Sequence, residues 1–467
     1  MTSRRVVVVG GGIAGLAAAH RLVEHARAGA DLDVVLLEGS ARLGGSLGTE
    51  RQGGFLLEHG ADSMITDKPW GLALCERVGL ADHLVGTREG ERRTYVVHDG
   101  RLHALPEGFL LLAPTALWPL VRSPIFSILG KARMALDLVL PRGSAGADES
   151  LAAFVRRRLG AEALERVADP LVGGIYTADP ERLSLAATMP RLLELERAHR
   201  SVILGLRQSA GAARASAGAR YALFVAPADG MGALVEGVAR ALPEGVVRLR
   251  ATVESLARNG PRWRVAASAQ AFDADAVIVT APAWVAAQLV APHDGALARD
   301  LDGIEYASSA TVTLGFRAEG VADKLEGFGF VVPFVERRSL LACTFASRKY
   351  PGRAPEGHEL LRAFVGGARR PDLVELDDES LLGTVRAELR ALLGIVAEPI
   401  LTRVERWRRA MPQYAVGHLD RVRDIESRAA ALPGLGLAGA AYRGVGIPDC
   451  VRSGEAAADA VAGRLRS

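Results

Sequence analysis

Three glycines near the start of the chain have the spacing of a phosphate-binding turn. The run Gly10-Gly11-Gly12-Ile13-Ala14-Gly15 matches G-x-G-x-x-G. The first glycine permits a tight turn, the second lets backbone approach a diphosphate, and the third lets a helix pack closely on a sheet. Free N–H groups at the start of that helix attract anions. An acid further along, Glu38, can accept a hydrogen bond from a ribose hydroxyl.

The elements around this turn are those that such a site requires. Val6-Val7-Val8-Val9 is a short β-branched run, typical of a buried parallel strand. A helix is expected from Leu16 to about Ala28, followed by a second strand, Val34 to Leu37, that leads into Glu38. Strand, glycine turn, helix, strand and acid in this order predict a dinucleotide-binding site. The alternative is a glycine turn that only packs.

Two further motifs indicate which dinucleotide binds. Arg42 and the pair Gly44-Gly45 follow the acid, and the run from Phe55 to Ser63 comes soon after. This arrangement resembles the flavin amine-oxidase superfamily, in which FAD lies extended across the same surface. The run from Gly439 to Cys450 resembles the second flavin motif of that superfamily. Because two motifs at opposite ends of the chain serve one cofactor, we expect FAD rather than NAD.

Length and composition restrict the function classes. The chain has 467 residues, which suggests two or three domains, and 49% of them are hydrophobic. The net charge is +3 and no block of like charge occurs, so nucleic acid is not expected as a partner. Cys75, Cys343 and Cys450 are too far apart to predict a disulfide framework or a metal site. The first strand begins soon after Met1, which leaves no room for a signal peptide, so a cytoplasmic location is expected.

One apolar stretch has three interpretations. Gly108 to Val121 is uncharged but is interrupted by Pro114 and Pro119, and it is too short to span a membrane. It can be buried core, the lining of a pocket for a greasy substrate, or a surface that dips into a bilayer. Core or pocket is favoured. Peripheral contact with the inner face of the cytoplasmic membrane therefore stays an open alternative.

The rest of the chain predicts an α/β fold with a discontinuous FAD-binding Rossmann-like domain, a substrate domain of mainly antiparallel sheet, and a helical subdomain. Sheet is expected in a hairpin around Asn259-Gly260, in a buried strand from Ala276 to Thr280 and in several runs between Ser308 and Trp407. Asp378 to Leu393 is expected to be helical. We expect FAD-binding segments at 1–70, 219–285 and 425–467, a helical substrate- or membrane-facing subdomain at 71–218, and the substrate sheet at 286–424.

Within the helical subdomain, residues 148–160 have the pattern of one complete helix. Asp148 is expected to cap its start and Gly160 to end it. The run Arg156 to Arg158 is interpreted as a solvated last turn that complements the helix dipole. The segment from Ser209 to Gly218, rich in small residues, is expected to be a loose linker.

Motifs in the middle of the chain narrow the resemblance. They are the runs Val172 to Asp179, Leu183 to Pro190, Glu196 to Ser201 and Pro412 to His418, which join the run Tyr442 to Cys450. Together they closely resemble the oxygen-dependent protoporphyrinogen and coproporphyrinogen oxidases of haem synthesis, in order and over nearly the whole chain. The resemblance implies a non-covalent FAD that takes hydride from a porphyrinogen and passes electrons to oxygen, so that three O2 become three H2O2. It indicates no catalytic acid or base.

The resemblance also implies site residues by position. The cofactor contacts would be Gly10, Gly11, Gly12, Ile13, Ala14, Gly15, Glu38, Arg42, Gly44, Gly45, Ser46, Gly60, Ala61, Asp62, Ser63, Val253, Trp407, Ala440, Val445, Gly446 and Ile447. The substrate contacts would be the carbonyl of Gly174, the side chains of Val331 and Phe364 on the macrocycle faces, and Arg93 on a propionate. Ala61-Asp62 departs from the family, which often has Pro-Asn or Pro-Arg there. The position of the arginine falls on Arg93 or Thr94.

Because the resemblance offers one arginine and the neighbours of Val331 and Phe364 are apolar, we expect protoporphyrinogen IX as the substrate, with coproporphyrinogen III as the alternative. Two other functions remain open. One is an amine oxidase with flavin tethered to a cysteine, for which Cys450 is the candidate. The other is a non-enzymatic binding protein on the same fold, like the GDP-dissociation inhibitors. A homodimer is a further open alternative.

Overall fold

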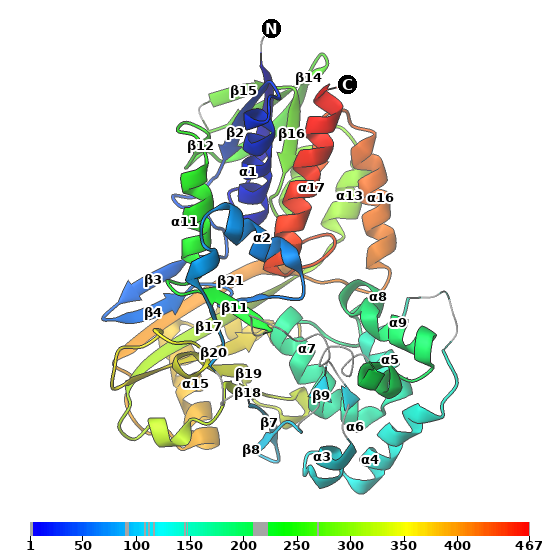
Figure 1. The fold of residues 1–467 in the computed structure, drawn as a ribbon, viewed down its shortest axis with the longest axis vertical. Helices are drawn as coiled ribbons and strands as arrows, with labels where there is room; N and C mark the ends of the chain where they lie inside the picture. The colour runs from blue at the N-terminus through cyan, green and yellow to red at the C-terminus, as the bar shows by residue number, and fades with distance from the viewer. Residues whose placement is uncertain are drawn as a thin grey trace.

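The computed structural model of the chain describes most of its length (Figure 1). The described residues are 3–88, 93–106, 109–110, 113–114, 117–143, 146, 148–208, 223–268 and 270–466. The linker expected at Ser209 to Gly218 and part of the apolar stretch from Gly108 to Val121 lie outside these ranges. Both ends of the chain lie at the top of the view in Figure 1.

A five-stranded parallel sheet is formed by three distant parts of the described chain. Its strand order is β12-β2-β1-β16-β22, and the bounds are Val247–Arg248, Leu32–Leu37, Arg4–Val9, Ala276–Val279 and Leu435–Leu437. Val6 to Val8 of the central strand are fully buried because both faces of the sheet are covered. The predicted Rossmann-like, discontinuous arrangement is therefore present.

Helices cover both faces of this sheet. On one face lie α1 (Ile13–Arg27), α2 (Pro69–Arg77), α11 (Gly232–Ala241) and α17 (Ile447–Arg466). The other face packs against α12 (Ala283–Val290), α13 (Gly295–Asp302), α16 (His418–Ala430) and the small sheet of β13 (Val253–Asn259), β14 (Arg262–Ala267) and β15 (Gln270–Ala274). α1 and α17 run side by side, and a Cβ on Gly454 would lie 2.1 Å from the Ala14 carbonyl oxygen. This packing brings the first and last segments of the chain together.

The second large sheet is mostly antiparallel. Its order among the described residues is β21-β17-β20-β19-β18-β7-β8, and the bounds are Leu401–Pro412, Tyr306–Arg317, His358–Gly366, Leu340–Phe345, Gly329–Val331, Thr94–His98 and Arg101–Ala104. One face packs on α15 (Asp378–Leu393), whose bounds agree with the sequence prediction. On the opposite face, Val331, Ala342, Phe364 and Thr311 form one row across four strands.

Strands β7 and β8 were expected to belong to a helical segment. They join the large sheet because Thr94 to Val97 is β-branched and aromatic, and because Asp99-Gly100 forms a hairpin turn. Both turn residues have positive φ (48° and 70°), as such a turn requires. The Asp-Gly pair was therefore the missed sequence signal. The domain boundaries given above remain predictions.

The described part of the helical subdomain lies below the parallel sheet in Figure 1. Its helices are α3 (Leu117–Arg122), α4 (Ile128–Ala135), α5 (Leu151–Arg158), α6 (Ala161–Ala163), α7 (Asp169–Tyr176), α8 (Leu185–Thr188) and α9 (Pro190–His199). The cap of α5 is Ser150, whose hydroxyl accepts from the Ala153 N–H. Asp148, predicted for that role, instead accepts from the Gly417 N–H at 2.9 Å and so ties this subdomain to the start of α16.

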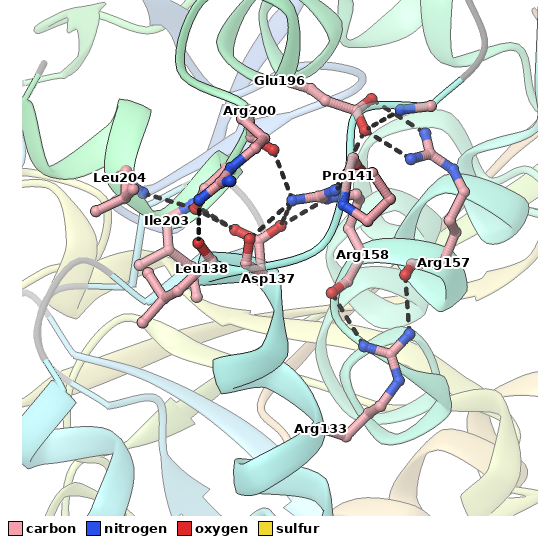
Figure 2. Close-up of polar contacts among 12 residues, drawn as sticks. Arg133, Asp137, Leu138, Pro141, Arg157, Arg158, Glu196, Arg200, Ile203 and Leu204 are labelled. Carbon is pink, nitrogen blue, oxygen red and sulfur yellow. Dashed lines mark hydrogen bonds and ion pairs between the residues drawn. The ribbon is translucent and has the colours of Figure 1, made fainter.

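A buried ion pair fixes the helices of this subdomain (Figure 2). Arg158 Nε donates to Asp137 Oδ1 at 2.6 Å, and both side chains are fully buried. The second oxygen of Asp137 accepts from the Ser201 hydroxyl and the Ile203 N–H. Arg158 was predicted to be part of a solvated face, but Asp137 draws it into the core. Arg158 also lies 3.4 Å from Glu196, so the larger loss is expected on removing Arg158, which would leave the buried charge of Asp137 without its cation at a cost of about 3–5 kcal/mol.

Candidate active site

The glycine turn at the start of α1 forms an open cradle. Gly12 is the N-cap residue of α1, and no described side chain caps the N–H groups there. A Cβ on Gly12 would meet no other described atom within 4 Å, whereas a Cβ on Gly15 would lie 1.9 Å from the Gly10 carbonyl oxygen. Gly12 pairs with Gly44 across the cradle. Free N–H groups facing open space fit the diphosphate of a dinucleotide.

Glu38 lies directly beside this turn, as predicted. Its Oε2 accepts from the Gly11 N–H at 2.6 Å and its Oε1 from the Ser40 N–H at 2.8 Å. The Ala251 N–H donates to the Glu38 carbonyl, which brings the segment leading to Val253 against the acid. Glu38 and Val253 therefore lie together at the carboxyl end of β2, where an adenosine ribose would bind.

The second glycine pair is held by Arg42. Its guanidinium donates to the carbonyl oxygens of Leu43, Gly45 and Leu47 at 3.2, 2.7 and 2.8 Å. Gly44 and Gly45 have φ of 101° and 60°, values that favour glycine. Arg42, predicted as a cofactor contact, thus shapes the loop that borders the cradle.

The loop from Gly60 to Ser63 contacts both the large sheet and the segment around Ser46 that follows the second glycine pair. A Cβ on Gly60 would lie 2.0 Å from the Ser46 carbonyl oxygen, so these two predicted residues touch. The preceding carbonyl, that of His59, accepts from Trp407 Nε1 at 3.2 Å and from Arg362 Nη2 at 3.0 Å. Trp407 on β21 therefore ties this loop to the large sheet.

The charged side chains around this loop form an ion pair, but two buried polar atoms near it lack a hydrogen-bond partner among the described residues. Lys349 Nζ contacts both oxygens of Asp62, at 3.1 and 3.0 Å. Burial alone would raise the pKa of Asp62, but Lys349 and Arg362 outweigh it and hold the pKa at about 2. Two buried atoms nearby, Thr311 Oγ1 and Arg362 Nε, have no hydrogen-bond partner among the described residues. Orphaned polar atoms of this kind fit a site that a polar cofactor completes.

The C-terminal motif reaches the same region from α17. Ala440 accepts from the Tyr414 hydroxyl at 2.6 Å, and that hydroxyl accepts from the Gly444 N–H at 2.9 Å. Val445 and Gly446 follow, and α17 begins at Ile447. The Cys450 thiol is buried, and this burial raises its pKa to about 12. A protonated, enclosed thiol is a poor nucleophile, which argues against a flavin tethered there.

A cavity of about 860 Å³ opens against the face of the large sheet. Its apolar lining includes Phe109, Phe224, Val331 and Ala342, and its cations among the described residues are Arg93, Arg122 and Lys349. Lys349 is already paired with Asp62. Apolar walls with a few placed charges are typical of sites for small ligands, and the volume lies in their usual range of roughly 300–1,000 Å³.

The four predicted substrate residues are only partly gathered by this cavity. Arg93 and Val331 line it. Phe364 lies in the same row of the sheet as Val331, with Ala342 between them, but is outside the lining. Gly174 lies on α7, where a Cβ would meet no other described atom within 4 Å, so space is open beside its backbone.

Sequence reasoning missed two of the lining cations. Arg122 directly follows the apolar stretch that ends at Val121, so a charge at the end of a greasy segment was an available signal. Lys349 follows the end of strand β19, and its sequence gives no sign that it reaches Asp62 or the cavity. Its contact depends on packing between distant segments.

Comparison with known proteins decides the family. The model of the flavin containing amine oxidoreductases matches residues 13–462. The chain belongs to this family. It is therefore an oxidoreductase whose cofactor is FAD, which confirms the prediction drawn from the two glycine motifs. The open cradle at Gly12 agrees with this assignment.

Members with similar length and sequence are also known. The chain is 36% identical to the coproporphyrinogen III oxidase of Bacillus subtilis (strain 168), covering 97% of each chain. It is 32% identical to the protoporphyrinogen oxidase of Macaca fascicularis, covering 98% of each. The solved structure of a protein from Exiguobacterium sp. 255-15, provisionally named a protoporphyrinogen oxidase, superposes with a TM-score of 0.89 at 32% identity and covers 99% of this chain and 100% of that one. The predicted resemblance and fold class are thus confirmed.

Proposed function

We propose that this flavoenzyme oxidises a porphyrinogen to a porphyrin with oxygen as the acceptor. The observation that carries the proposal is the cavity of about 860 Å³, which combines apolar walls with arginines and adjoins the flavin-side loop through Lys349. The porphyrinogen loses six electrons and six protons, and three O2 take them up as three H2O2. Bound FAD, held without a covalent bond, supplies the two-electron chemistry.

The residues of the chain bind and orient the substrate. Val331, in the cavity, and Phe364, beside it, offer apolar contact to the faces of the macrocycle. Arg93 and Arg122 line the cavity and can pair with carboxylates. The carbonyl of Gly174, beside open space on α7, can accept from pyrrole N–H groups. We assign no catalytic acid or base.

Protoporphyrinogen IX is the first candidate substrate, because the lining near Val331 is apolar. Coproporphyrinogen III is the second, and one observation favours it specifically. The expectation from sequence counted one cation, but Arg122 joins Arg93 at the cavity, and a substrate with two more carboxylates needs more cations. The 36% identity to a relative named coproporphyrinogen III oxidase, against 32% to one named protoporphyrinogen oxidase, supports the same choice.

Steady-state kinetics on both porphyrinogens with oxygen tests the proposal. We expect porphyrin and H2O2 in a ratio of about one to three with the preferred substrate, which the six-electron balance requires. Denaturing the protein should release its yellow cofactor, whereas an amine oxidase with flavin tethered at Cys450 would keep it. A purified protein that turns over an amine but neither porphyrinogen would overturn the proposal.

We also propose that the helical subdomain contacts a lipid surface. Among the described residues no helix is long and apolar enough to cross a membrane. Yet this subdomain exposes several large apolar side chains close together in sequence, namely Trp118, Val121, Ile128, Leu129, Leu136 and Val139. Ile128 and Leu129 are 85% and 81% exposed. The stretch suspected from sequence, Gly108 to Val121, is mixed: Trp118 and Val121 are exposed, but Leu120 is buried and Phe109 lines the cavity. Exposed large apolar side chains gathered in one segment are typical of a surface that binds a lipid bilayer peripherally.

Sedimentation with vesicles of phosphatidylcholine and phosphatidylglycerol tests this contact. The wild type should sediment with them, and I128N/L129N should not. V396N/I400N is the matched control, because Val396 and Ile400 are an exposed apolar pair elsewhere on the molecule. Equal sedimentation of the two double variants would show that Ile128 and Leu129 do not contribute to lipid binding. Ultracentrifugation of the same samples without vesicles distinguishes a monomer from a homodimer.

A further inference from the structure

One arginine is paired with carboxylates at both ends of helix α7. Arg369 Nη1 lies 2.8 Å from Asp169 Oδ1, and its Nη2 lies 2.7 Å from Asp179 Oδ1. Asp169 is the first residue of α7, and Asp179 comes shortly after its last residue, Tyr176. Arg369 follows strand β20, which carries Phe364. One guanidinium therefore connects the substrate sheet to both ends of the helix that carries Gly174.

Further contacts reinforce this connection. The Ala368 N–H donates to the Thr177 carbonyl at 2.8 Å, just after α7 ends. The second oxygen of Asp169 accepts from the Phe334 N–H at 3.1 Å, and the guanidinium of Arg369 lies over the Phe334 ring at 4.5 Å. Asp169 is nearly buried and the Arg369 side chain is 23% exposed. The pair is thus shielded from water more than a surface ion pair is.

One face of α7 packs into the core through Val172, which is fully buried, whereas the face that carries Gly174 has no such packing among the described residues. A Cβ on Gly173 or on Gly174 would meet no other described atom within 4 Å, and the next residue, Ile175, is 55% exposed. Glycine also costs a helix about 1 kcal/mol in its interior. α7 is preceded by a π-helical turn, Leu164–Ala168, and is ended by Thr177 at a φ of 48°. Val172 anchors the buried face of the helix, and the contacts at its two ends hold the face that carries the glycines.

We propose that Arg369 is a positioning residue that sets the distance between α7 and the sheet face of Val331 and Phe364. The inference rests on the proposed function, because it assumes that a macrocycle lies between Gly174 and that face. A guanidinium has a planar fork that can bind two carboxylates at once, which a lysine ammonium does far less well. Loss of Arg369 releases both ends of α7 and disorders one wall of the substrate site without touching the cofactor cradle.

The test compares three variants of the full-length, FAD-loaded protein. Arg369→Met should raise KM for the preferred porphyrinogen about tenfold while FAD content stays normal, because orientation is lost and cofactor contacts are kept. Arg369→Lys should fall between this variant and the wild type. Arg370→Met is the matched control, because Arg370 is the next residue and its side chain pairs with the nearby Asp372 at the surface. It should behave as the wild type.

Amide hydrogen exchange over residues 169–179 separates this proposal from the proposed function. Exchange there should be faster in Arg369→Met than in Arg370→Met, whatever the substrate. If Arg369→Met does not fold, Asp179→Asn removes one of the two ion pairs of Arg369. This variant should also raise KM and speed amide exchange over residues 169–179. If the wild type is active and Arg369→Met has the same KM and the same exchange rates, the positioning role of Arg369 is overturned and the proposed function stands. A wild type inactive on both porphyrinogens overturns the proposed function instead.

Discussion

The cradle at the glycine turn is assembled mostly from backbone, whereas the cavity on the large sheet is assembled mostly from side chains. Gly10 to Gly15 and the loop at Gly44 lie within a short stretch and depend on N–H groups and on the lack of a Cβ, and Glu38 adds one carboxylate that accepts from the Gly11 N–H. The cavity instead draws on residues from Thr87 to Lys349, brought together by sheet register and helix packing. Substitutions in the glycine turn should therefore nearly abolish FAD binding, whereas substitutions in the cavity should raise KM by graded amounts.

The largest effect is expected at Gly12. Gly12→Val places a side chain in space that the protein leaves open, so the fold should persist while FAD is lost almost completely. Flavin absorbance per mole of purified protein and circular dichroism measure the two properties. Gly463→Val is the control, because a Cβ there also meets no other described atom within 4 Å but lies far along α17. A yellow Gly12→Val protein would show that the turn is not the diphosphate site.

The next effect concerns Glu38. Glu38→Ala removes the acceptor of the Gly11 and Ser40 N–H groups as well as the predicted ribose contact. FAD binding should weaken by roughly 1–3 kcal/mol, the cost of leaving such groups unpaired. Titration of the apoprotein with FAD measures this, and Glu38→Gln, which keeps one acceptor oxygen, should lose less. An unchanged dissociation constant in Glu38→Ala would count against the assignment.

A graded effect is expected in the substrate region. Phe364→Ala should raise KM for the preferred porphyrinogen roughly tenfold while FAD content stays normal, because it removes apolar contact worth about 1.5–3 kcal/mol at most. Arg122→Ala and Arg93→Ala should raise KM several-fold, and more for coproporphyrinogen III than for protoporphyrinogen IX. Loss of FAD in Phe364→Ala would contradict the claim that the substrate region can be altered without affecting the cofactor.

The last effect, on folding stability rather than on cofactor or substrate binding, is a pH dependence near the second flavin motif. His418 stacks on Tyr414 and bonds to the Tyr442 carbonyl, and burial lowers its pKa from 6.5 to about 4. The unfolded chain binds this proton below pH 6.5 and the native chain does not, so the free energy of unfolding should fall by about 1.4 kcal/mol per pH unit as the pH is lowered from 6.5 to 4. Unfolding in urea at several pH values measures the slope. His418→Gln should flatten it, and an equal slope in both proteins would contradict the prediction.

The same division explains what the sequence could predict. The glycine turn, the acid at Glu38 and the helix Asp378–Leu393 follow from local spacing, and all are present. The row that places Val331 and Phe364 on one face depends on register between strands, so the resemblance could name these residues but not their surroundings. Arg158 was misjudged because its partner, Asp137, comes from another helix. Lys349 was missed for the same kind of reason: its partner, Asp62, is remote in sequence.

The most direct test of the central claim is anaerobic mixing of the yellow protein with each porphyrinogen. Reduction of the flavin should bleach its absorbance on mixing with protoporphyrinogen IX or coproporphyrinogen III, and oxygen should restore it as porphyrin fluorescence and H2O2 appear. The faster of the two reactions identifies the substrate. A flavin that stays oxidised with both porphyrinogens, yet is bleached by an amine, would contradict the proposed function and leave only the family assignment.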